Sequence, residues 1–259
     1  MKNIVNKFCL SAYNSLFSKL AFTLAETLVV MGIIGVVAAL TIPNLNQSTG
    51  NKEKVAKLQK IYANLDDAFG RAVATYGSIP KWFVNLGEDD SAEIITANRI
   101  GDFLKINKTC LDGESGCFAS GLYKAGQGNT GIPFNKAYLL ADGTAVQFFI
   151  SDNTCTSTNG QISNVCGSIT VDIDGPKGVN SYGIDTFMFE ISKSGIFPSG
   201  GQNTSEGATL ESLQSTCFDT RFSCAGWVIA NGNMDYLKAD AEGVCPNGTE
   251  LSWENTSCK

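Results

Sequence analysis

The segment that most constrains this chain is a long apolar run near its start. The stretch LAFTLAETLVVMGIIGVVAALTIPNL, from Leu20 to Leu45, holds a single charged residue, Glu26. Residues 22–43 of this run, as an α-helix rising about 1.5 Å per residue, would cross a hydrocarbon layer of about 30 Å. We therefore expect a transmembrane segment over 22–43. A carboxylate in hydrocarbon is costly unless it is paired, so Glu26 is expected to have a functional partner.

Two interpretations of the N-terminal region compete. Residues 1–21 contain three lysines and no acid, which favours a cytoplasmic N-terminus. In the first interpretation the apolar run is an ordinary secretory signal that is cut after Ala39, which would leave a secreted protein. In the second, the cut lies between Ala21 and Phe22, and the apolar run stays on the mature chain. The long basic leader and the position of Glu26 favour the second interpretation.

The residues around this second cut resemble a known motif. The sequence AFTLAE at 21–26, followed by an apolar helix, is similar to the prepilin cleavage and methylation motif of type IV pilins and of type II secretion pseudopilins. The shared features are a basic leader, an aromatic first mature residue and a glutamate as the fifth. The family usually has glycine before the cut, where this chain has Ala21. Gly35 and Pro43 also fall where the family commonly has a glycine and a proline.

The resemblance implies a route of maturation and assembly. A prepilin peptidase would remove the leader, residues 1–21, and the new amine of Phe22 would be methylated. Glu26 would then pair with the Phe22 amine of a neighbouring copy as helices stack in a filament. The implied partners are copies of itself or other pilins, the prepilin peptidase, an inner-membrane assembly platform with its ATPase, and the lipid bilayer before assembly. The implied location is a single-pass bacterial inner-membrane protein that becomes a periplasmic or extracellular filament.

A second helix is expected after the apolar run. Pro43 lacks an N–H and clashes with the preceding turn, so a kink or break is expected there. The resemblance implies that the helix can also loosen at Gly35. Gly77 and Pro80 should end the helical region. We expect one helical segment over 22–77 and a globular head over 78–259. Apolar residues recur every three or four positions in the second half, which predicts a stripe facing the head: Val55, Leu58, Ile61, Leu65, Phe69, Val73 and Tyr76.

The head is expected to be rich in β-strands. The run 137–150 reads as two strands around an Asp142-Gly143 turn, and further strands are expected at 168–173 and 186–191. Two predictions are open for Trp227 and Tyr236. They could form the core and edge of a strand-turn unit with Asn231-Gly232 as its turn, or they could form an exposed binding platform. The predicted fold class is α+β: a long N-terminal helix, with a membrane half and an amphipathic half, packed on an antiparallel β-sheet head with disulfide-stapled loops.

Cysteine usage favours export. Of nine cysteines, Cys9 lies in the predicted leader, and the other eight follow the apolar run, as expected for disulfides made in an oxidising compartment. Eight cysteines allow 105 connectivities. Close spacing favours sequential pairs: Cys110–Cys117, Cys155–Cys166, Cys217–Cys224 and Cys245–Cys258.

One loop carries oxygen ligands suited to calcium. The stretch VDIDGPKGVNSYGID holds Asp172, Asp174, Asn180 and Asp185 in a glycine-rich loop. The spacing does not match an EF-hand, and these residues could instead cap turns. A structural calcium ion is an expectation here, supported by the resemblance because some pseudopilins bind calcium in a head loop.

Composition narrows the function classes. The formal charge of −6 argues against nucleic acid as a partner, and the lack of histidine removes the commonest general base. Together with the resemblance, which implies a filament subunit, these properties lead us to expect no catalytic residues. The alternatives are a secreted or membrane-anchored protein that binds a carbohydrate or surface ligand, a hydrolase built on carboxylates, and a minor pilin with an adhesive role.

Overall fold

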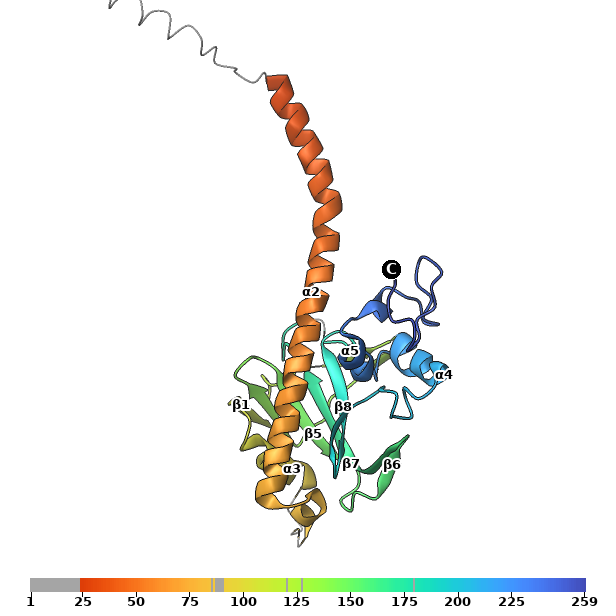
Figure 1. Ribbon diagram of the computed structural model, residues 1–259. Helices are drawn as coiled ribbons and strands as arrows, with labels where there is room; N and C mark the ends of the chain where they lie inside the picture. The colour runs from red at the N-terminus through yellow and green to blue at the C-terminus, as the bar shows by residue number, and fades with distance from the viewer. Residues whose placement is uncertain (1–23, 85, 87–90, 120, 127, 179) are drawn as a thin grey trace, which may run out of the picture. The chain divides into compact units, whose positions relative to one another are not determined.

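A computed structural model describes residues 24–84, 86, 91–119, 121–126, 128–178 and 180–259, and for 38–49 it describes the backbone alone. The chain divides into two units, 1–49 and 50–259. Figure 1 shows the elements of the second unit, in which helices lie beside an antiparallel sheet. The α+β class with an antiparallel sheet and disulfides is as expected.

The elements follow one another along the chain from helices to strands and back to helices. The helical elements are α2 (Leu24–Tyr76), η1 (Ile79–Phe83), α3 (Ala92–Gly101), α4 (Leu210–Leu213), η2 (Gln214–Asp219), α5 (Ala225–Asn231) and η3 (Asp235–Leu237). The strands are β1 (Ile106–Leu111), β2 (Tyr123–Ala125), β3 (Gly128–Thr130), β4 (Lys136–Leu140), β5 (Ala145–Ile150), β6 (Ser157–Asn159), β7 (Ile162–Asp172), β8 (Thr186–Ser192) and β9 (Gly195–Pro198).

The expected membrane half of the N-terminal helix is corrected. Among the residues that the structure describes, no helix is long and apolar enough to cross a membrane. The membrane half of the fold class predicted from the sequence is therefore wrong.

Of the kink or break expected at Pro43, the break is wrong, and a kink stays a prediction. Residues 24–76 are assigned as one α-helix of 53 residues, which includes Gly35, Pro43 and the polar stretch after it. A proline removes only one backbone donor, so the hydrogen bonds on either side can continue the helical assignment. The helix does end where expected, because Gly77 takes a left-handed φ of 82° directly after Tyr76.

Within the second unit, the amphipathic part of α2 packs on the sheet as predicted. Leu58, Ile61 and Leu65 have no exposed surface, and Val55 and Phe69 are buried with them. Their core partners include Phe148, Phe187 and Phe189 from the central strands. The last predicted position of the stripe differs, because Tyr76 is exposed; its ring lies 6.3 Å from that of Phe103 and its hydroxyl donates to Asp102.

The main sheet, in the described residues, has the order β1-β4-β5-β7-β8-β9, with β6 paired to β7. All of these pairings are antiparallel. The predicted hairpin is confirmed: β4 and β5 pair around a turn in which Gly143 has a φ of 85°. Of the other two predicted strands, β8 matches closely, and β7 begins six residues earlier than expected.

The C-terminal region forms short helices rather than the predicted strand-turn unit. Trp227 lies in α5, and Gly232 ends that helix in the left-handed conformation, donating its N–H to Val228. The sequence Asn-Gly is thus a helix terminus here, because glycine suits the left-handed residue after a helix as well as a hairpin turn. Neither Trp227 nor Tyr236 has exposed surface, so the two do not form a binding platform.

Candidate functional site

The first candidate site is the apolar start of α2. Glu26 lies in the first turn of the helix, and the residues that follow it form an almost continuous apolar surface. The large apolar side chains here are between 53% and 80% exposed. They are Leu24, Leu28, Val29, Val30, Met31, Ile33, Ile34, Val36 and Val37. Patches of this kind mark surfaces that another molecule covers.

The processing residues lie next to this surface in the sequence. Ala21, Phe22 and Cys9 are outside the described residues. The predicted cleavage, the methylation of Phe22 and the pairing of Glu26 therefore stay predictions. Glu26 itself is described and lies on α2, two residues after the first helical residue.

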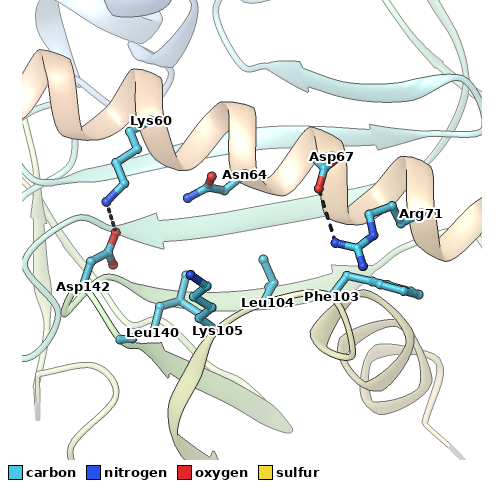
Figure 2. Close-up of a pocket in the computed structure, with 10 residues that line it drawn as sticks. Lys60, Asn64, Asp67, Arg71, Phe103, Leu104, Lys105, Leu140 and Asp142 are labelled. Carbon is cyan, nitrogen blue, oxygen red and sulfur yellow. Dashed lines mark hydrogen bonds and ion pairs between the residues drawn. The ribbon is translucent and has the colours of Figure 1, made fainter.

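The second candidate site is a groove beside the head half of α2, shown in Figure 2. One wall is the polar face of α2, with Lys60, Asn64, Asp67 and Arg71 at spacings of three or four residues, which brings them to one side of the helix. The other wall is formed by the segment between α3 and β1 together with the β4–β5 turn. It contributes Phe103, Leu104, Lys105, Leu140, Ala141 and Asp142 to a hollow of about 490 Å³.

Two ion pairs line this groove. Lys60 Nζ lies 3.4 Å from Asp142 Oδ2 and so joins α2 to the β4–β5 turn. Arg71 lies 3.7 Å from Asp67 one turn earlier on the same helix, and its guanidinium carbon is 4.7 Å from the centre of the Phe103 ring. Partial burial is the largest single influence on the Asp142 carboxyl, and it raises the pKa. Hydrogen bonds from Thr144 and Lys60 together outweigh burial, so the pKa of Asp142 is below its usual value.

The sequence analysis did not find this groove. The polar spacing along α2 is visible in the sequence and predicts a solvated helix face. The opposite wall comes from residues about 35 to 80 positions later, which only the fold brings next to α2.

The four predicted calcium ligands occupy one loop but have separate roles. Asp185 accepts hydrogen bonds from the backbone N–H groups of Asn180 and Ser181, at 2.9 and 2.7 Å. Asp172 is fully buried at the end of β7 and accepts a 2.8 Å hydrogen bond from the Tyr123 hydroxyl. In the described part of the chain, no group of three or more acidic, cysteine or histidine residues is arranged to hold a metal ion.

Two oxygen atoms in this loop remain without a hydrogen bond to any described residue. They are Asp174 Oδ1 and Asn180 Oδ1, and both atoms are buried. Burial, followed by the neighbouring Asp174, raises the pKa of Asp172 to about 9. Without a bound cation Asp172 is thus expected to be protonated at neutral pH, and calcium binding at this loop stays a prediction.

The four predicted disulfides are confirmed: Cys110–Cys117, Cys155–Cys166, Cys217–Cys224 and Cys245–Cys258. Each closes a short loop, with sequence separations from 7 to 13. Four disulfides indicate an oxidising compartment outside the cytoplasm.

Comparisons of this chain with protein-family models, with curated proteins and with solved structures found no match.

Proposed function

We propose that this protein is a structural subunit of a type IV pilus-like filament or a type II secretion pseudopilus, matured by a prepilin peptidase. The observation that carries the proposal is the exposed apolar surface of α2 between Leu24 and Val37, which begins directly after the prepilin-like motif. A helix with nine large apolar side chains in water is unfavourable by itself. Copies of the same helix, packed side by side, would cover this surface.

The free energy available from such packing is large. Full burial of one large apolar side chain contributes about 1.5–3 kcal/mol, so nine together would contribute on the order of 15–25 kcal/mol before the entropic cost of association. Contacts of this kind are not directional. A filament also needs a feature that sets the axial position of each copy.

Glu26 supplies that feature in the proposal. Its carboxylate would pair with the Phe22 amine of the next copy, which exists only after the leader has been removed. A carboxylate buried among apolar helices is costly unless a cation meets it, so copies displaced along the axis would be unfavourable. Cleavage would therefore control assembly, and a separate ATPase would drive it. The disulfide-bonded head would form the exposed part of each subunit.

The experiment is expression of the full chain in cells that contain a prepilin peptidase and its filament apparatus. We expect mass spectrometry to find a mature N-terminal peptide that starts at methylated Phe22, and we expect sheared filaments to contain the protein. A peptide that starts near Leu40 would contradict the proposal and would support a secreted protein with an ordinary signal.

Glu26→Gln is the matching variant. It removes the charge with little change in size and should prevent filament formation while leaving cleavage intact. Glu53→Gln, at an exposed acid on the same helix, is the control and should assemble normally.

A further inference from the structure

Glu190 is a half-buried carboxylate on β8. It lies directly opposite Ser168 of β7 and Phe197 of β9. Directly opposed side chains of an antiparallel pair share one face, so a hydroxyl and an aromatic ring flank the carboxylate. Its Oε1 accepts a 2.8 Å hydrogen bond from the Ser199 hydroxyl. Among the described residues, Glu190 forms no ion pair with a lysine or an arginine.

A second carboxylate, Glu206, lies near the first, on the segment between β9 and α4. The side-chain amide of Asn159 donates to both carboxylate oxygens of Glu206, at 3.2 and 3.1 Å. The same amide donates to Glu190, and Glu206 is the charged group that acts on Glu190. The neighbouring stretches 157–171 and 194–205 contain no charged side chain. Two carboxylates therefore share one neutral donor.

That donor stands at the tip of the β6–β7 hairpin, which touches the segment after β9. Asn159 Oδ1 accepts from the backbone N–H of Ser205 at 2.9 Å, and the Gln161 N–H donates to the Asn203 carbonyl at 2.8 Å. A Cβ on Gly160 would lie 2.6 Å from the Ser205 nitrogen, so the two backbones are in direct contact. We call the contact of these residues the clasp. In Figure 1 the β6 end of the hairpin extends away from α2.

The segment that carries Glu206 also supports the C-terminal region. The Thr216 hydroxyl, from η2, donates to the Glu206 carbonyl oxygen at 2.9 Å. The indole N–H of Trp253 donates to the Gly207 carbonyl at 2.9 Å. A shift of this segment would therefore reach η2 and the residues near the C-terminus.

The two carboxylates make the clasp dependent on pH. Burial, the largest influence, raises the pKa of Glu190, and so does the charge of Glu206, while the hydrogen bonds from Ser199 and Asn159 act against this rise without cancelling it. A carboxyl with a raised pKa holds its proton more tightly in the folded than in the unfolded chain, where the pKa is about 4.3. Its contribution to stability is fully present below that pH and is lost as the pH rises through the folded-state pKa.

We propose that the clasp is a pH-sensitive switch, which is tight when Glu190 is protonated and opens more readily when Glu190 and Glu206 are both charged. Protonated Glu190 does not repel Glu206 and leaves the Asn159 amide to it. When both are charged, two partly buried carboxylates compete for that amide. This inference is independent of the proposed filament. The disulfides indicate a compartment outside the cytoplasm, and the clasp would respond to the pH there.

The test is hydrogen–deuterium exchange of the full chain in detergent, read by mass spectrometry. Gln161 and Ser205 report on the clasp, because their N–H groups donate across it. After correction for intrinsic exchange rates, we expect the protection of peptides with these amides to fall severalfold between about pH 4 and about pH 8. Peptides from β5 should keep their protection. The pKa of Asp152, at the base of the hairpin, lies far below this range, so its charge stays constant. Equal corrected protection at both pH values would overturn the switch.

Two variants separate the charge from the shape of the side chain. Glu190→Gln cannot ionise, so its clasp should stay protected at the higher pH and lose the dependence on pH. Glu211→Gln, at an exposed acid in the first turn of α4, is the matched control and should behave as the wild type. The same pH dependence in Glu190→Gln and the wild type would contradict the proposal.

Asn159→Asp gives the opposite change, because it removes the shared donor and adds a third carboxylate. Its clasp should be open at the higher pH and recover protection in acid. A loss of protection that is equal at both pH values would contradict the role of charge. Circular dichroism checks that each variant is folded, and the wild-type comparison does not depend on any variant.

Discussion

The carboxylate of Asp152 accepts a hydrogen bond from the backbone N–H of Ser157, with 2.9 Å between Oδ2 and the nitrogen. The same side chain accepts from the N–H groups of Thr154, Cys155 and Thr156 and from nearby hydroxyls. One carboxylate thus organises the turn over residues 152–157, where the loop closed by the Cys155–Cys166 disulfide begins.

This network makes a prediction about pH. The hydrogen bond from the Thr154 hydroxyl, with those from neighbouring groups, holds the pKa of Asp152 far below its usual value. A lowered pKa contributes stability that is present above the unfolded-state pKa of about 4 and is lost as the pH falls further. Asp152→Asn should therefore be less stable than the wild type at pH 7.

The difference between the two proteins should shrink as the pH is lowered from about 4 towards 2. Urea unfolding across this range measures it. A difference that stays constant with pH would show that the charge of Asp152 is not what the loop needs. Asp112→Asn, at another exposed acid, is the control.

The packing of α2 on the sheet predicts a large effect at Leu65. Its side chain has no exposed surface, so Leu65→Ala would leave a cavity and should lower the free energy of unfolding by about 2–5 kcal/mol. Gln59→Ala, at an exposed position on the same helix, should change it by less than about 0.5 kcal/mol. Similar effects of the two substitutions would contradict the packing seen here.

The Cys245–Cys258 disulfide closes the longest of the four described loops, with a sequence separation of 13. A cross-link of this span stabilises a fold by about 3 kcal/mol, mainly by restricting the unfolded chain. The double variant Cys245→Ser and Cys258→Ser should lose about this much in chemical unfolding. Adding a reductant to that variant should lower its stability further, because three disulfides remain.

Calcium binding can be tested at the loop between β7 and β8. Asp174 Oδ1 and Asn180 Oδ1 are buried without a hydrogen bond to the described residues, and oxygens of this kind are the ligands that calcium prefers. We expect calcium to raise the melting temperature relative to a chelator, and Asp174→Ala to remove the increase. Magnesium is the control, since it demands tighter octahedral geometry. No increase with the wild type would overturn the calcium prediction.

Several features of this protein follow from local sequence. The periodic apolar residues from Val55 to Phe69 predicted the buried face of α2, because a helix repeats every 3.6 residues whatever it packs against. Asp142-Gly143 predicted the β4–β5 hairpin, since glycine readily takes the left-handed conformation of its turn. The four disulfides followed from spacing, because cysteines close in sequence stay close in space.

Other features depend on tertiary structure. Asn231-Gly232 has the same local preference in a hairpin as at a helix end, and packing of Trp227 in the core selected the helix. The continuity of α2 through Pro43 likewise differs from the local expectation. The groove between Lys60 and Asp142 joins residues 82 positions apart, so no local pattern encodes it. The sequence by itself determined which faces are apolar, because that is a short-range property, and its cysteine spacing favoured the four pairs that the structure confirms. The fold alone decided which charged residues share a surface, because that depends on contacts between distant segments.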